Sequence, residues 1–196
     1  MVTLSSDYLG GTITRIRLFA SAPNTALAQA LCDHLQQLGA TRSSVVALDA
    51  DGDGADLAIC IAGEADDAVA ALNRRLSRQA LPCLFVHVDG GRAQLGPWTY
   101  YGHTPCWACY RTTLRFFRGQ PQLADHGGSA DPAVFVPFVT AQLLALLRGE
   151  SALIGGAVLA VGGGEADAAR ALKDPLCEVC SIWSRQPTEA FYVQQD

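Results

Sequence analysis

The sequence has few basic residues and no long apolar run. Lys and Arg number 14 among 196 residues, against 19 Asp and Glu, and the formal net charge is −5. Proteins that bind nucleic acid through its phosphates carry an excess of positive charge, so nucleic acid is excluded as the main partner. The apolar stretches are short and interrupted by Gly and Pro, which excludes a membrane span. Residues 1–8 show no basic region followed by an apolar one, so we also expect no signal peptide and a cytoplasmic location.

Hydrophobic residues, which make up 49% of the chain, follow the pattern of alternating strands and helices. A helix capped by Asn24 and ended by Gly39 follows the first strand, and a second helix spans 65–79. This alternation predicts an α/β fold, Rossmann-like and with a mainly parallel sheet. The predicted strands are 13–20, 44–50, 55–63 and 82–90.

The pattern changes after Gly90. We expect a hairpin that leads into a Cys-bearing turn, a surface loop over 119–132, a helix over 136–148 and a strand over 152–164. The Gly-rich segment 162–165 has no following Lys, so a flexible turn explains it better than a phosphate loop. We interpret 1–196 as one domain, with a Rossmann-like part over 12–90 and a metal-binding and C-terminal part over 91–196.

The turn after the first strand lacks glycine. A nucleotide-binding Rossmann unit needs glycine there so that its backbone can approach phosphates, but this chain reads "FASAPNTALAQ" over 19–29. Pro23 also removes one N–H donor. Asp49, at the end of the second strand, stands where a ribose-binding carboxylate often lies, although an Asp ending a strand is also commonplace. We therefore expect a nucleotide-like fold without the phosphate-binding equipment.

Seven cysteines are many for a chain of this kind, and their odd number argues against a disulfide framework. Three lie in apolar helix or strand patterns and are interpreted as small buried hydrophobes: Cys32, Cys60 and Cys83. The other four form two C-x2-C pairs separated by 67 residues: Cys106 with Cys109, and Cys177 with Cys180. Two such turns can complete a tetrahedral shell of four thiolates, typical of structural Zn2+.

Two alternatives to zinc remain open for the four thiols. Four-cysteine sites also hold iron–sulfur clusters, and one C-x2-C pair could serve redox chemistry if it had an exposed Cys of low pKa. A closed shell of four thiolates leaves no open coordination position, so we expect no catalysis at this site. For the same reason we expect His103, three residues before Cys106, to be structural or exposed to solvent.

The segments around the thiol pairs carry a family resemblance. "GGRAQLGPWTYYGHTPCWACYR" over 90–111 and "DPLCEVCS" over 174–181 resemble the ThiF/MoeB-like partner proteins of YcaO cyclodehydratases in thiazole/oxazole-modified peptide pathways. The matching positions are Gly96, Pro97, Gly102, Thr104, Pro105, Cys106, Cys109, Pro175, Cys177 and Cys180. The resemblance implies a ThiF/MoeB-type core and a zinc site. The zinc site would join a hairpin turn to the C-terminal segment.

The resemblance also implies partners. A YcaO enzyme uses ATP to form azolines in a ribosomal precursor peptide, and its ThiF-like partner helps to present that peptide. Only a dozen residues precede the first strand, so we expect the family's winged-helix recognition element to be missing here. The leading hypothesis is a non-adenylating accessory subunit for bacteriocin-type (RiPP) biosynthesis. The alternatives are an adenylyltransferase acting on a peptide or carrier-protein C-terminus, and a redox or sulfur-handling protein.

The aromatic residues of the hairpin are candidates for a partner contact. Aromatic side chains are enriched at interface hot spots, although core packing is the more ordinary role for a hairpin of aromatics. The candidates are Trp98, Tyr100, Tyr101, Trp107 and Tyr110. A homodimer is a further expectation, because ThiF/MoeB-like cores commonly pair.

Overall fold

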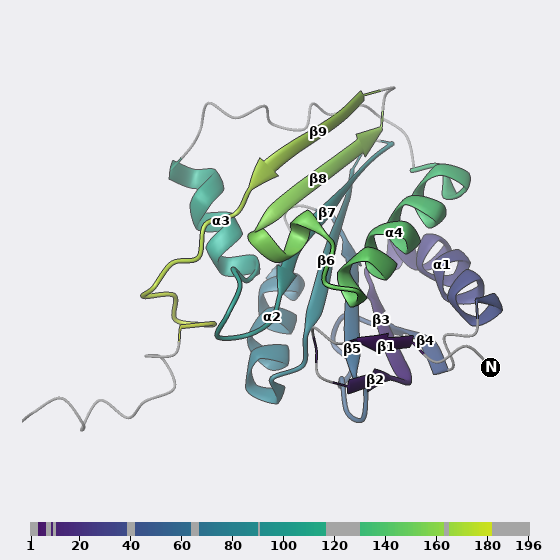
Figure 1. Ribbon diagram of the computed structural model, residues 1–196, viewed down its shortest axis with the longest axis horizontal. Helices are drawn as coiled ribbons and strands as arrows, with labels where there is room; N and C mark the ends of the chain where they lie inside the picture. Colours follow the sequence, from purple (N-terminus) through teal and green to yellow (C-terminus); the bar gives the residue numbers. More distant parts are fainter. Residues whose placement is uncertain are drawn as a thin grey trace, which may run out of the picture.

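The computed structural model describes residues 4–6, 9, 11–38, 42–63, 67–89, 91–116, 130–162 and 165–181. Seven strands form one sheet in the order β4-β3-β5-β6-β7-β8-β9, and β1 pairs separately with β2 (Figure 1). The strands are β1 Leu4–Ser6, β2 Gly11–Ile13, β3 Arg15–Ala20, β4 Arg42–Ala47, β5 Leu57–Ala62, β6 Cys83–Asp89, β7 Arg92–Thr99, β8 Ala157–Gly162 and β9 Glu165–Arg170. The α-helices are α1 Thr25–Gln37, α2 Asp67–Gln79, α3 Trp107–Phe116 and α4 Pro132–Leu147.

The first half of the sheet is parallel, as the alternating pattern predicts. β3 lies between β4 and β5, β5 pairs with β6, and all three pairs run parallel. Helix α1 connects β3 with β4, and α2 connects β5 with β6. All six residues of β5 are buried, which explains their continuous apolar character, because a central parallel strand is covered on both faces.

The second half of the sheet corrects the expectation of a mainly parallel arrangement. β6 with β7, β7 with β8, and β8 with β9 are all antiparallel, so parallel and antiparallel pairs are equal in number. Chain connectivity explains two of these three pairs. Only two residues separate β6 from β7, and only two separate β8 from β9, whereas a parallel connection needs a crossover of a dozen or more residues. The Gly-rich segment 162–165 spans the connection between β8 and β9, and its residues 163–164 lie outside the described residues.

Two helices cover each face of the sheet (Figure 1). α1 and α4 pack on one face, where the buried side chains include Leu31 and Leu143. α2 and α3 pack on the other, where the buried side chains include Leu72 and Tyr110 together with all four cysteines of the two pairs. The thiol pairs are therefore placed within the core of the α2/α3 face.

Helix α4 begins earlier than the sequence predicts. It starts at Pro132 and not at residue 136, because the Asp131 side chain caps it by accepting a hydrogen bond from the Ala133 N–H at 2.9 Å. Proline suits the first helical position, since its missing N–H has no partner there. Most of the predicted loop 119–132 lies outside the described residues. No helix in the described part of the chain combines the length and the apolar character needed to cross a bilayer.

Two other boundaries differ from the prediction. The strand predicted over 152–164 begins with a 3-10 turn, Ala152–Gly155, and only then becomes β8. Asn24 holds the cap position of α1 as predicted but makes no side-chain cap, because its amide donates to Ser21 Oγ at 2.9 Å. The hairpin formed by β1 and β2 was not predicted from the sequence.

Candidate metal centre

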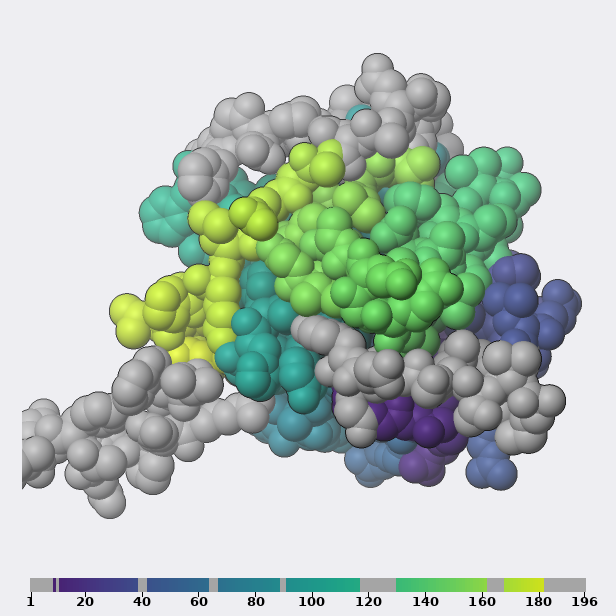
Figure 2. Space-filling view, viewed as in Figure 1, coloured from purple at the N-terminus to yellow at the C-terminus, as the bar shows by residue number. Residues whose placement is uncertain are grey.

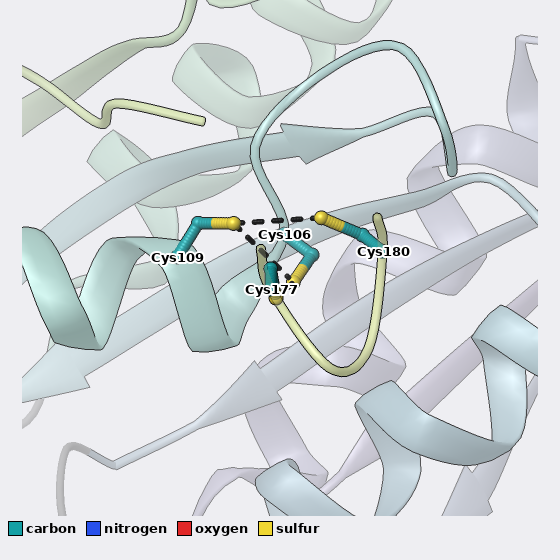
Figure 3. Close-up of side chains that lie close together, drawn as sticks. All are labelled: Cys106, Cys109, Cys177 and Cys180. Carbon is teal, nitrogen blue, oxygen red and sulfur yellow. Dashed lines mark hydrogen bonds between the residues drawn. The ribbon is translucent and has the colours of Figure 1, made fainter. Parts of the chain in front are cut away.

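Four cysteine sulfurs converge between α3 and the segment that follows β9 (Figure 3). The Sγ atom of Cys106 lies 3.9 Å from that of Cys109 and 3.7 Å from that of Cys177. The sulfurs of Cys109 and Cys180 are 3.4 Å apart. All four lie within 4.8 Å of one another, and all four residues are buried. The two C-x2-C pairs predicted to act together are thus brought together by the fold.

The spacing of these sulfurs fits a metal site. Tetrahedral sulfur ligands at the usual zinc–sulfur distance of about 2.3 Å lie about 3.8 Å from one another. The three distances, 3.4 to 3.9 Å, scatter around that value. A disulfide needs a sulfur–sulfur distance of about 2.05 Å, and all seven cysteines are free thiols. The cluster could therefore hold one metal ion, and its donor set of four thiolates suits zinc or iron.

Each pair is built into a tight turn. Cys106 directly precedes α3 and Cys109 lies in its first turn, where the Tyr110 N–H donates to the Cys106 carbonyl at 3.0 Å. The second pair belongs to residues 172–181, which we call the C-terminal knuckle. Within it the Cys177 N–H donates to the Asp174 carbonyl at 3.2 Å, and the Ser181 N–H donates to the Cys177 carbonyl at 3.0 Å. These local bonds place two sulfurs of each turn on the same side.

Besides the sulfur–sulfur contacts, hydrogen bonds from nitrogen and oxygen donors attach the C-terminal knuckle to the rest of the molecule. In the core, Ser77 Oγ on α2 donates to the Val179 carbonyl at 2.6 Å. The others are from Leu172 N–H to Thr113 Oγ1, from Lys173 Nζ to the Gly102 carbonyl, and from Asp174 N–H to Cys109 Sγ. The knuckle is therefore tied to both α2 and α3.

Gly156 allows the two turns to approach each other. Its φ is +83°, a conformation that favours glycine, and a Cβ atom there would meet the Ala171 carbonyl oxygen at 2.7 Å and Pro105 at 3.4 Å. The Ala171 N–H donates to the Gly156 carbonyl at 2.8 Å. Any side chain at this position would push the start of the knuckle away from the segment that carries Cys106.

A buried polar pair supports the sulfurs from outside the cluster. Asn73 on α2 donates from Nδ2 to Cys106 Sγ at 3.6 Å. The hydroxyl of Tyr101 donates to Asn73 Oδ1 at 3.1 Å, which fixes the amide so that its nitrogen faces the sulfur. Both residues are buried, and hydrogen bonds of this kind orient metal ligands and stabilise thiolate charge. Sequence reasoning missed Asn73, although it was visible as a polar residue on the apolar stripe that contains Val69, Leu72 and Leu76.

The four clustered thiols differ in pKa. The hydrogen bond with Cys106 lowers the pKa of Cys109 to about 7 and also lowers the pKa of Cys177. The pKa of Cys106 is raised, chiefly by its hydrogen bond with Cys109, and that of Cys180 is raised chiefly by Cys106. Four thiolates at this spacing repel one another, so a bound cation would displace the remaining protons and neutralise part of the charge.

Most of the aromatic candidates for a partner contact are buried. Trp98 is fully buried, Tyr101, Trp107 and Tyr110 are each 5% exposed, and Tyr100 is half-buried. Tyr110 accepts a hydrogen bond from Gln94, and Trp107 stacks on Phe85 with ring centroids 5.6 Å apart. Core packing, the ordinary alternative, therefore accounts for the burial of these four side chains.

Asp49 and the glycine-free turn lie at the same edge of the sheet, since β4 runs parallel to β3. Asp49 is exposed, just beyond β4. The backbone of the turn is used within the fold: the Ser21 N–H donates to the Ile61 carbonyl at 3.1 Å, and the Asn24 N–H donates to the Ser21 carbonyl at 2.8 Å. These two N–H groups are engaged, and Pro23 has none to offer.

The remaining cysteines and His103 are placed as the sequence predicts. Cys32, Cys60 and Cys83 are at most 2% exposed and lie in the core. His103 is exposed, stacks on Tyr100 with ring centroids 4.8 Å apart, and does not belong to the four-thiol cluster. The cluster therefore consists of sulfur donors alone among the described residues.

The half-parallel, half-antiparallel sheet with helices on both faces defines the fold class, and solved structures share it. The heterocyclase TruD aligns with a TM-score of 0.64 at 15% identity, covering 86% of this chain and 28% of that one. A heterocyclase in complex with substrate and cofactor aligns with a TM-score of 0.67 at 16% identity, covering 86% of this chain and 26% of the other. E. coli MccB aligns with a TM-score of 0.59 at 14% identity, covering 91% of this chain and 60% of that one.

These likenesses concern the fold. At 14 to 16% identity they show a fold shared with these proteins and no further relationship. The chain spans about a quarter of the length of the heterocyclases and about three fifths of MccB. No protein-family model matches the sequence, and no curated protein matches it.

Proposed function

We propose that this chain is a zinc-stabilised, ThiF-like accessory subunit in the modification of a ribosomal peptide. Its partners would be an azoline-forming YcaO cyclodehydratase and the precursor peptide. The observation that carries the proposal is the buried four-sulfur cluster at zinc spacing, on a fold shared with two heterocyclases. In this role the metal would supply structure: it would hold α3 and the C-terminal knuckle together without an open coordination position.

The glycine-free turn supports an accessory role without adenylation. A phosphate-binding turn presents free backbone N–H groups, but those of Ser21 and Asn24 donate within the fold. Asp49 would then make no contact with a nucleotide. Replacement of Asp49 by Ala is expected to leave pathway activity nearly unchanged.

Reconstitution tests the proposal. The YcaO enzyme from the same pathway and its precursor peptide are incubated with ATP, with and without this chain, and ring formation is followed by mass spectrometry as the loss of one water for each azoline. We expect rings to form much faster when the chain is present. Metal analysis of the purified chain should give one zinc ion per molecule. Equal rates with and without the chain would refute the accessory role.

An adenylyltransferase is the second candidate. It is favoured by the likeness to MccB, of which one structure at a TM-score of 0.51 contains the nucleotide analogue AMPCPP and MccA. ATP–pyrophosphate exchange with a candidate peptide separates the two functions. Exchange that is lost in the Asp49→Ala variant would favour the enzyme, whereas no exchange and no heat of ATP binding would favour the accessory subunit.

A further inference from the structure

A groove of about 360 Å3 lies between α2 and α3 beside the metal centre. Part of the C-terminal knuckle forms a third wall, and Figure 2 shows that segment, in yellow, at the surface of the molecule. Asp67 and Arg74 line it from α2, Arg111 and Arg115 from α3, and Glu178 from the knuckle. We call this feature the arginine groove.

The arginine groove concentrates positive charge in an acidic protein. Three arginines and two acidic residues line the groove, although the whole chain has a net charge of −5. Arg111 and Arg115 are four residues apart and so lie on one face of α3. Arg74 and Arg115 are exposed, and within the described residues neither forms an ion pair. Their charges are therefore available to a ligand.

The rest of the lining is apolar or neutral and includes Ala70, Trp107, Ala108 and Val179. Arginine forks bind carboxylates as well as phosphates, but Asp67 and Glu178 would repel the concentrated charge of a phosphate. The small volume suits a short segment of chain, because a stable contact with a folded protein buries about 800 Å2 on each side. Alternating apolar and acidic side chains would match this lining.

We propose that the arginine groove binds a short acidic segment of the precursor peptide, with its carboxylates on Arg74 and Arg115 and its apolar side chains against Ala70 and Ala108. The proposal rests on the proposed function only in naming the source of the peptide. The groove depends on the metal centre for its shape, because Glu178 and Val179 lie between Cys177 and Cys180.

Fluorescence anisotropy with the full-length, metal-loaded chain tests the proposal. The probe is a short fluorescein-labelled peptide in which Glu alternates with Ala and Leu, and its counterpart has every Glu replaced by Gln. The test variant combines Arg74→Gln with Arg115→Gln. The control combines Arg42→Gln with Arg148→Gln, which removes the same charge from exposed arginines outside the groove. Melting temperature and metal content verify that each variant is folded.

We expect the Glu peptide to bind at least tenfold more tightly than the Gln peptide. The groove variant should weaken binding by about tenfold, since two partly exposed charge pairs are lost, and the control variant by less than twofold. Three results would each overturn the proposal: the Glu peptide does not bind, the control variant weakens its binding as much as the groove variant does, or inorganic pyrophosphate binds more tightly than the Glu peptide. None of these measurements depends on ring formation. A negative result for peptide binding in the groove is therefore distinct from a negative result for the accessory role.

Discussion

Removal of the metal ion is expected to release the C-terminal knuckle while the sheet stays folded. Ordering the backbone of residues 172–181 costs about 10 to 20 kcal/mol. Apart from the contacts between sulfurs that are remade with the metal, four hydrogen bonds from Ser77, Leu172, Lys173 and Asp174 and four within the knuckle contribute about 1 kcal/mol each. Burial of Val179 adds about 2 kcal/mol. These contributions only match the lower end of the cost, so the knuckle is marginal without about 10 kcal/mol from a structural metal.

The cysteines provide a built-in assay for this release. All seven are buried, so we expect them to react slowly with a thiol reagent when the metal is bound. After chelation, the four ligands should react quickly, while Cys32, Cys60 and Cys83 stay protected by the sheet and its helices. Hydrogen exchange measured on the same samples should increase in residues 172–181 and remain slow in β5 and β6.

Two substitutions control for effects of the chelator itself. Cys177→Ser removes one ligand and should reproduce the release, because three thiolates hold zinc more weakly than four. Cys32→Ala removes a buried thiol far from the cluster and should leave both metal and knuckle in place. Reaction of all seven cysteines together would refute local release and make the metal essential to the whole fold. Unchanged reactivity after complete metal removal would refute any structural role for the ion.

Two further predictions concern polar residues. Asn73→Leu removes the hydrogen-bond donor to Cys106 and should weaken zinc binding by about tenfold or more, as measured by competition with a chromophoric chelator. Tyr101→Phe should weaken zinc binding in the same way but less strongly. Lower stability of these variants with unchanged zinc affinity would contradict the prediction. Partial burial acts to raise the pKa of Asp56, but hydrogen bonds from Thr14 and Arg15 outweigh it and leave that pKa lowered. The ionised carboxylate therefore stabilises the fold above its unfolded pKa of about 3.9, and this stabilisation is lost as the pH falls through the pKa of the folded state. In urea unfolding, Asp56→Asn should be roughly 1 kcal/mol less stable than the unchanged protein at about pH 7, and the difference should shrink towards about pH 3. A stability difference that did not change with pH would contradict this prediction.

The four-cysteine cluster was predictable because its elements are local. Each C-x2-C pair places two sulfurs on one side of a turn, a geometry that depends only on residues close together in sequence. The sequence does not show what brings the pairs together across 67 residues. That depends on Gly156, against which Ala171 and Pro105 both pack closely, and on the bond from Ser77 to Val179. Such contacts join distant segments and leave no periodic signal.

The parallel half of the sheet was predictable for a related reason. Its strands and helices alternate, and each has the apolar period of its own structure. β9 was missed because its sequence, EADAAR, consists mostly of residues that are depleted in strands. Its place at the sheet edge comes from pairing with β8, from Ala157 with Arg170 to Gly162 with Glu165. Pairing of this kind overrides a weak intrinsic preference.

The metal centre and the arginine groove share structural elements, which makes their proposed ligands interdependent. Asn73 donates to Cys106 and also lines the groove, and Trp107, the neighbour of Cys106 in sequence, forms part of the groove wall. A metal ion that fixes α2, α3 and the knuckle would therefore preorganise the groove, and a bound peptide would stabilise the same arrangement. By thermodynamic linkage, if the metal increases the affinity for the peptide by some factor, the peptide must increase the affinity for the metal by the same factor. A peptide that binds the groove should thus slow the loss of zinc to a chelator, and the Gln counterpart should not.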